Sequence, residues 1–137
     1  MSIAPPAAPR HAPDAAEIEA MARAALTSLP AELRDAAAGV RLVVEELPDE
    51  DVLRELGIDH PYGLTGLYHG RPLTERSIEE SGRMPDTVTL YRVPILIEWV
   101  EDGHELGHLV RHVLIHEIGH HFGFSDADMH ALEADAD

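Results

Sequence analysis

The chain opens with apolar residues at helical spacing. Apolar side chains recur every three or four residues in an Ala- and Glu-rich stretch: Ile18, Met21, Ala25 and Leu29. This is the repeat of one helix face, so we predict a helix that begins at Pro13-Asp14 and ends at Pro30, with a short second helix over residues 31–38. Residues 1–13 are rich in Ala and Pro and lack this repeat. We therefore expect a flexible tail ahead of a domain at residues 14–137.

Stretches rich in β-branched residues predict strands further along the chain. Residues 40–44 (VRLVV) and 87–97 (TVTLYRVPILI) carry this pattern. Pro94 lies inside the second stretch, and because proline cannot donate a main-chain hydrogen bond, we place it at the end of that strand or at a bulge. A short edge strand is predicted at residues 67–69, within a glycine-rich turn region, whereas the polar residues 74–86 indicate irregular structure.

The longest helical pattern lies near the C-terminus, at residues 103–122. Gly123 follows it and predicts a left-handed stop, and Ser125 with Asp128 three residues later fits the capping box of a final helix. A shorter helix is predicted at residues 49–56. Together these elements predict an α/β (α+β) fold, a single small domain in which a short mixed sheet of about three strands packs on helices.

Composition narrows the class of protein. The chain has 137 residues, of which 45% are apolar, enough for one domain with a hydrophobic core. Its formal net charge of −16 repels phosphate groups and anionic lipid headgroups, so neither nucleic acid nor a membrane surface is expected as a partner. Cysteine is absent, which leaves imidazole and carboxylate as metal ligands. Without a secretory signal pattern or an apolar run of about 20 residues, we expect a cytoplasmic protein, by default a monomer.

A His-Glu-x-x-His pattern supplies the candidate chemistry. It consists of His116, Glu117 and His120 within the run HEIGH. On a helix, two histidines four residues apart lie on nearly the same face, about 6 Å apart along the axis, and can bind one zinc ion. Glu117 projects about 100° round the helix from His116, beside the metal. There a carboxylate can take a proton from water at the metal.

Two residues beyond this pattern supply a third ligand. In a chain with 10 histidines the five-residue pattern can arise by chance, but Gly123 and Asp126 at their offsets make it specific. Glycine accepts positive φ cheaply, so the chain can reverse after the helix and return Asp126 to the metal. Three protein ligands leave a fourth position open for water and substrate. The alternative is that Asp126 only complements the dipole of the final helix.

The other histidines of the long helical segment are not predicted to bind this metal. His104, His108 and His112 continue the four-residue spacing, but each step rises about 6 Å and drifts about 40°. His112 is then about 12 Å along the axis from His120 and cannot share its ion, so we interpret it as a polar neighbour. His121 points away from the metal and is interpreted as a structural residue.

Three stretches resemble the bacterial minimal zincin-like metallopeptidases. They are residues 66–77 (GLYHGRPLTERS), 85–96 (PDTVTLYRVPIL) and 116–126 (HEIGHHFGFSD), and the likeness extends over residues 30–137. The resemblance implies a compact α/β domain with a small sheet packed on helices. It also implies zinc held by three ligands and a glutamate base: His116, His120 and Asp126, with Glu117. Metzincins place a Met-turn well beyond the zinc signature, whereas Met129 is too close for that role, so a full metzincin architecture is not expected.

These observations lead to the hypothesis of a zinc-dependent metallopeptidase that hydrolyses a peptide or protein substrate. An edge strand at residues 67–69 could hold an extended peptide by main-chain pairing. Tyr68, His69 and Tyr91 are candidates for contacting the substrate or stabilising the oxyanion, and the sequence does not choose among them. The native metal also stays open, because imidazole and carboxylate suit iron, manganese or nickel as well as Zn²⁺.

Two other classes of protein remain compatible with the same residues. A non-catalytic zinc protein would use the ion to tie the final turn to the long helix or to mediate an interaction. A metal-storage protein would use all the histidines of the long helix and bind several ions per chain. Cleavage of a peptide library and the number of ions bound per chain separate these alternatives.

Overall fold

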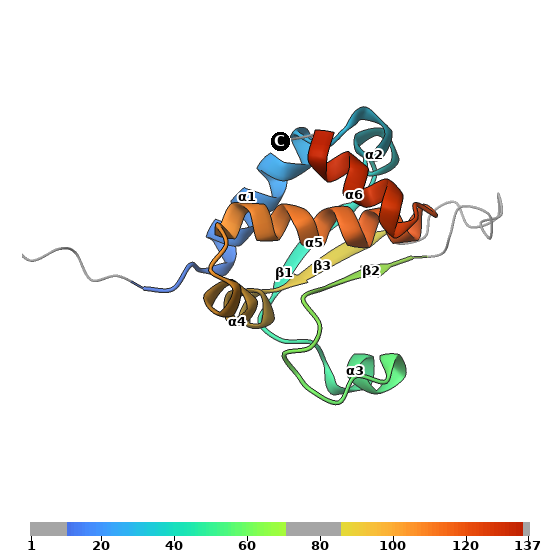
Figure 1. Ribbon diagram of the computed structural model, residues 1–137. Coiled ribbons are helices and arrows are strands. Elements are labelled where there is room, and N and C mark those ends of the chain that lie inside the picture. The colour runs from blue at the N-terminus through green and yellow to red at the C-terminus, as the bar shows by residue number, and fades with distance from the viewer. Residues whose placement is uncertain (1–10, 71–85, 136–137) are drawn as a thin grey trace, which may run out of the picture.

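A three-stranded mixed sheet lies against one side of a layer of helices in the computed structural model, which describes residues 11–70 and 86–135 (Figure 1). The strands are β1 (Arg41–Glu45), β2 (Gly66–His69) and β3 (Thr87–Tyr91), and their order in the sheet is β1-β3-β2. The central β3 pairs in parallel with β1 and antiparallel with β2. The mixed sheet of three strands and the edge position of β2 confirm the predictions from the sequence.

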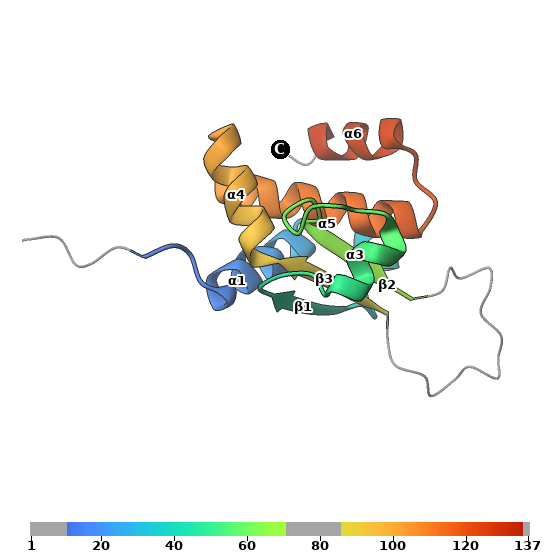
Figure 2. The same cartoon turned by 90° about the horizontal axis from the view of Figure 1, so that it is seen from below.

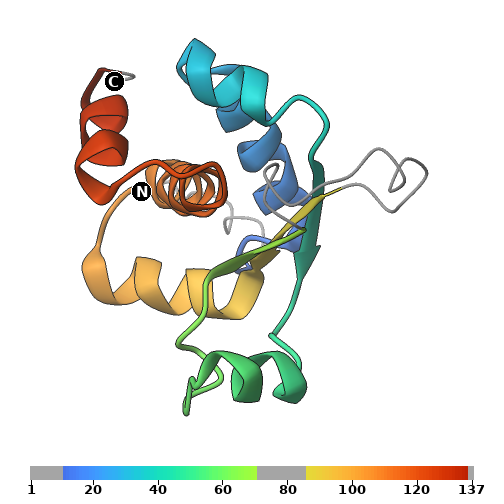
Figure 3. The ribbon, with the colours of Figure 1, turned by 90° about the vertical axis from the view of Figure 1, so that its right-hand side faces the viewer.

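Six helices are present among the described residues: α1 (Ala15–Thr27), α2 (Ala31–Ala36), α3 (Glu50–Leu56), α4 (Arg92–Asp102), α5 (Leu106–His121) and α6 (Asp126–Asp135). Figure 3 looks nearly along α5 and shows this helix in the middle, with the sheet on one side and α6 on the other. Figure 2 shows the same order of layers from below. The helix that carries the His-Glu-x-x-His pattern is therefore enclosed between the sheet and α6.

Burial of apolar side chains holds α5 in this central position. The buried residues of α5 are spread around most of its circumference: Leu106, Leu109, Val110, Val113, Leu114, Ile115 and Ile118. They meet the buried face of α1, which includes Ile18, Ala22 and Ala25, and the buried side chains of β3. Burying one such aliphatic side chain contributes roughly 1.5–3 kcal/mol. The core therefore sets the position of α5 firmly against α1 and the sheet.

The predicted strand at residues 87–97 is wrong in its second half. β3 ends at Tyr91, and α4 begins at Arg92. Pro94 is the third residue of α4, where the missing N–H costs nothing because the first-turn N–H groups have no partner within the helix. Ile95 on α4 is fully buried against the core. An apolar run of this length can form either element, and here packing on the core selected the helix.

A glycine with positive φ follows each of the helices α4 and α5. Gly103 adopts a φ of 72° and ends α4, so α5 begins at Leu106 instead of near residue 103 as predicted. Gly123, with a φ of 83°, confirms the predicted left-handed turn after α5. These positive φ values are costly for residues with a side chain.

The predicted capping box of the final helix is present. The main-chain N–H of Ser125 donates to Asp128 Oδ2, and the N–H of Asp128 donates to Ser125 Oγ, both over 3.1 Å. No helix of the described residues is long and apolar enough to cross a bilayer. Most of the irregular stretch predicted at residues 74–86, and residues 1–10 of the predicted tail, lie outside the described residues.

Candidate metal centre

The end of α5 and the start of α6 bring together the three predicted metal ligands. One nitrogen each of His116 and His120 and one carboxylate oxygen of Asp126 all lie within 4.8 Å of one another. His120 Nε2 is 2.9 Å from Asp126 Oδ1. The turn at Gly123 produces this approach, because it reverses the chain within six residues of His120. Two imidazoles and a carboxylate fit the donor set of a zinc site with an open fourth position.

Electrostatics in the centre favours the protonation states that bind metal. Burial lowers the pKa of His116, and the neighbouring imidazoles of His112 and His120 lower it further. A neutral imidazole keeps the lone pair that a metal needs. The hydrogen bond from His120 lowers the pKa of Asp126, which therefore stays ionised. The shifts thus favour neutral His116 and ionised Asp126, the forms in which these two groups bind a metal.

Glu117 lies on the side of α5 that faces β2. Its carboxylate accepts a hydrogen bond from the main chain of Tyr68, and burial is the largest influence on its pKa, which is raised. The approach of β2 to α5 depends on Gly66, since a Cβ atom there would lie 2.7 Å from Val113 Cγ1 and 3.3 Å from Glu117 Cγ. A half-buried carboxylate with a raised pKa, next to two candidate ligands, is what general-base catalysis requires.

Tyr68 contributes to this region chiefly through its packing. Its hydroxyl donates to Asp86 Oδ2 over 3.1 Å, and its ring stacks on His121 with the centroids 3.7 Å apart. The side chain of His121 is 7% exposed, with Nε2 3.7 Å from Asp86 Oδ2. The structural role expected for His121 agrees with this arrangement. The ring and hydroxyl of Tyr68 thus contact His121 and Asp86, whereas its main chain donates to Glu117.

The two other candidates for substrate contact differ in exposure. His69 is exposed at the end of β2. Tyr91 is 2% exposed. Burial and then the nearby acidic side chains raise the pKa of Tyr91 to about 12, so its phenol stays neutral under physiological conditions. Of these two residues, His69 is the one that a substrate can reach from solvent.

Met129 packs directly beneath the His-Glu-x-x-His turn, a contact that the sequence did not predict. The residue is fully buried on α6. A Cβ atom at Gly119 would lie 2.4 Å from the Met129 sulfur and 2.8 Å from its Cγ, so only glycine leaves room for this side chain. The signal in the sequence was a glycine within the metal-binding pattern, whose helix propensity is poor. Here Gly119 lets α6 dock against the part of α5 that carries His116 and His120.

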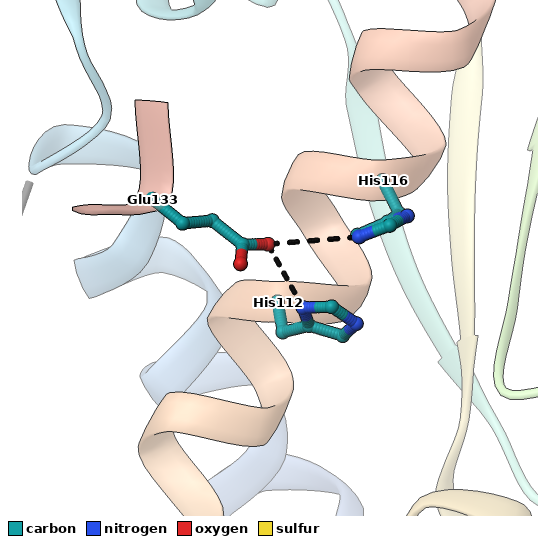
Figure 4. A group of neighbouring side chains, drawn as sticks. All are labelled: His112, His116 and Glu133. Atoms are coloured by element: carbon teal, nitrogen blue, oxygen red, sulfur yellow. Dashed lines mark hydrogen bonds and ion pairs between the residues drawn. The ribbon is translucent and has the colours of Figure 1, made fainter. Parts of the chain in front are cut away.

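A second group of possible ligands lies one turn earlier on α5. His112 Nδ1 is 2.8 Å from Glu133 Oε1, and His116 Nε2 is 3.7 Å from the same oxygen. Figure 4 shows the Glu133 carboxylate on α6 pointing toward both rings. The sequence predicted that His112 cannot share an ion with His120. In the described residues the two histidines belong to different groups of possible ligands, which agrees with this prediction. It did not indicate Glu133, because only the return of α6 along α5 brings that residue to His112.

A third group, His11, Asp14 and Glu17, is exposed at the start of α1. Its contacts have a structural explanation. The Asp14 side chain accepts a hydrogen bond from the N–H of Glu17 and so caps α1. His11 forms an exposed ion pair with Glu17 over 3.5 Å. Exposed pairs of this kind contribute little to stability, and this group adds nothing to the candidate centre.

Comparison with known proteins identifies the family of the chain. Residues 37–136 match the model of a family described as zincin-like metallopeptidase. No curated protein matches the chain. Since the family model covers most of the chain, the protein belongs to the zincin-like metallopeptidase family, as the resemblance implied.

Proposed function

We propose that this member of the zincin-like metallopeptidase family is a zinc-dependent peptidase, with Zn²⁺ held by His116, His120 and Asp126 and Glu117 as general base. The observation that carries the proposal is the arrangement around α5. Three ligand atoms gather within 4.8 Å on the side toward α6, and a half-buried carboxylate stands beside them on the side toward β2. A site that only stored or sequestered metal would not need that carboxylate.

Each residue has a distinct task in the proposed reaction. When bound, zinc would act as a Lewis acid that polarises the scissile carbonyl group and makes water more acidic. Glu117 accepts the proton of the attacking water at its carboxylate and delivers it to the leaving amine. The hydrogen bond from the main chain of Tyr68 holds this carboxylate in position. Burial raises the pKa of Glu117 and so makes it a stronger base than an exposed glutamate.

The outer edge of β2, which pairs with no further strand among the described residues, supports a peptide as the substrate. The N–H of Tyr91 donates to the carbonyl of Thr65 over 2.9 Å, which makes this a hydrogen-bonded pair in the antiparallel register. Because such pairs alternate, the main-chain groups of Gly66 and Tyr68 face away from β3, where the N–H of Tyr68 donates to Glu117. An extended peptide could lie along the exposed end of this strand, at His69, close to Glu117. We propose a peptide or protein substrate bound in this way by a monomeric, cytoplasmic protein.

The test is cleavage of a broad peptide library by the full chain, before and after removal of metal. We expect cleavage that a chelator abolishes and added zinc restores. Glu117→Gln should retain one zinc ion per chain and lose activity by at least about 100-fold, the contribution typical of a positioned acid–base group. Glu101→Gln, an exposed change on α4, serves as the matched control and should keep full activity.

The alternative is a zinc ion that only ties α6 to α5, and one observation favours it. The ligands come from both helices, and Asp126 is the first residue of α6. If the alternative holds, the wild-type protein binds zinc yet cleaves no peptide of the library. Retained cleavage in Glu117→Gln would instead contradict the general-base role alone.

A further inference from the structure

The histidine face of α5 carries more ligand atoms than one metal ion can use. His112, His116 and His120 follow one another at four-residue intervals, and α6 runs back along this face. α6 contributes two carboxylates, Asp126 beside His120 and Glu133 beside His112. The two acids are seven positions apart, which corresponds to about 10 Å along a helix. Each carboxylate therefore meets a different pair of imidazoles.

We propose that His112, His116 and Glu133 form a second binding site for a divalent transition-metal ion such as Zn²⁺, and that it shares His116 with the first site. The three ligand atoms lie within 4.8 Å of one another, the same limit that the His116, His120 and Asp126 group satisfies. We call this site the upstream site. It is additional to the proposed peptidase centre, and metal binding there does not require that the protein cleaves peptides.

The upstream site differs from the first group in the spacing of its rings and in the exposure of its carboxylate. The His112 and His116 rings lie 4.1 Å apart, compared with 5.8 Å for His116 and His120. The Glu133 side chain is 23% exposed, whereas that of Asp126 is 84% exposed. A less exposed carboxylate loses less conformational entropy when it binds, because its contacts already restrict it. Two imidazoles and one carboxylate are again a donor set that suits zinc.

An ion can reach the upstream site from solvent. A hollow lined by His108, Arg111, His112 and Glu133 opens beside it. The neighbouring groove between α4 and α5 carries further imidazoles and carboxylates along its walls: Glu98, Asp102, His104 and His108. The carboxylates of Glu98 and Asp102 are partly exposed and exposed, respectively, and could attract a cation toward His112. Both hollows are lined by His112, and the first is also lined by Glu133, so each adjoins the upstream site.

Sharing of His116 makes occupancy of the two sites mutually exclusive when its Nε2 is the donor to both. An ion in the upstream site would take His116 away from His120 and Asp126. It would also lie a helical turn further from the end of α5 than an ion held by His120, and so farther from substrate held beside Glu117. The upstream site is thus a place to hold a metal ion without activating the peptidase centre. The two sites thus compete for the His116 imidazole, one with Asp126 as its carboxylate ligand and the other with Glu133.

The experiment locates the ion when the first site is disabled. Crystals of the full-length His120→Ala variant are grown with Zn²⁺, anomalous diffraction is recorded at the zinc edge, and zinc per chain is measured in solution. We expect one ion per chain, positioned between His112, His116 and Glu133. Adding Glu133→Gln should weaken zinc binding by at least 10-fold, because even outer partners of metal ligands are worth about 10–100-fold. Adding the exposed change Glu101→Gln should leave affinity unchanged.

Two results would overturn the proposal. One is the absence of zinc from the upstream site in His120→Ala at a concentration that saturates the wild-type protein. The other is equal zinc affinity with and without Glu133→Gln, which would make the His112–Glu133 contact an ion pair only. Circular dichroism of each variant checks that it folds. All readouts are metal position and affinity, so the result is independent of whether the protein cleaves peptides.

Discussion

At the scale of single residues, burial and neighbouring charge determine what a side chain can do. Tyr91 was a candidate for stabilising an oxyanion, but it lies 2% exposed under the junction of β3 and α4. Its pKa of about 12 results from burial first and then from acidic neighbours that include Glu45 and Asp49. The Tyr91 phenol therefore affects the stability of the fold at high pH.

The pKa of Tyr91 predicts a loss of stability in alkali. The phenol ionises near pH 10 in the unfolded chain but near pH 12 in the fold. Its contribution is complete below pH 10 and is lost as the pH rises through 12, because the unfolded chain releases the proton first. We expect the free energy of unfolding in urea to fall as the pH rises from 10 to 12. In Tyr91→Phe, which has no phenol to ionise, this fall should be smaller by about 2 kcal/mol. Tyr62→Phe, an exposed control, should follow the wild type.

At the scale of elements, the position of α6 determines whether the candidate metal ligands meet. This helix begins at Asp126, its capping box joins Ser125 to Asp128, and Met129 docks it against Gly119. Glu133 lies further along the same helix. Its position relative to α5 therefore controls the carboxylate of both candidate sites.

Removing the cap should loosen this helix. Ser125→Ala deletes the oxygen that accepts the hydrogen bond from the N–H of Asp128. We expect it to lower the free energy of unfolding by about 0.5–2 kcal/mol, and Ser125→Thr, which keeps an acceptor, to restore most of that loss. Denaturant unfolding monitored by circular dichroism measures both. Equal stability of Ser125→Ala and the wild type would show that the bond from the Asp128 N–H to Ser125 Oγ contributes nothing to α6.

The junction of β3 and α4 illustrates a second lesson about elements. Residues 87–97 are apolar and rich in β-branched side chains, and this local pattern predicted one long strand. The chain changes to helix at Arg92 because Ile95 then reaches the core and Pro94 falls in a first turn, where it is tolerated. β1 and the edge strand β2 matched their predicted positions closely, since both are short and bounded by clear turn signals.

At the scale of the whole molecule, charge and metal binding are connected. The chain carries a formal charge of −16, so the folded state concentrates negative charge that a bound cation offsets. The candidate ligands come from two helices that converge only in the fold. A metal ion that binds them would stabilise the folded chain relative to the unfolded one.

Zinc should therefore raise the melting temperature. An ion at 100 times its Kd adds about 2.7 kcal/mol, which corresponds to roughly 10 °C for a domain of this size. Differential scanning calorimetry with and without zinc measures the shift, and a chelator should reverse it. His116→Ala should show almost none of it, because His116 belongs to both groups of ligands. A full zinc-induced shift in His116→Ala would place the stabilising ion elsewhere.

The sequence by itself determined the local features of this protein. The helix of the His-Glu-x-x-His pattern, the left-handed turn at Gly123 and the capping box at Ser125 depend on residues close together in the chain, so their signals were complete. The meeting of His116, His120 and Asp126 also spans a short segment, and it could be predicted for the same reason.

Only the tertiary structure decided the contacts between distant segments. It brought Glu133 to His112, placed Met129 against Gly119, and set the edge of β2 next to Glu117. None of these contacts leaves a local repeat or spacing in the sequence, because each depends on how helices and strands pack around a shared core. The residues of the first proposed metal site thus lie within one short segment, residues 116–126, whereas the second proposed site exists only because α6 returns along α5.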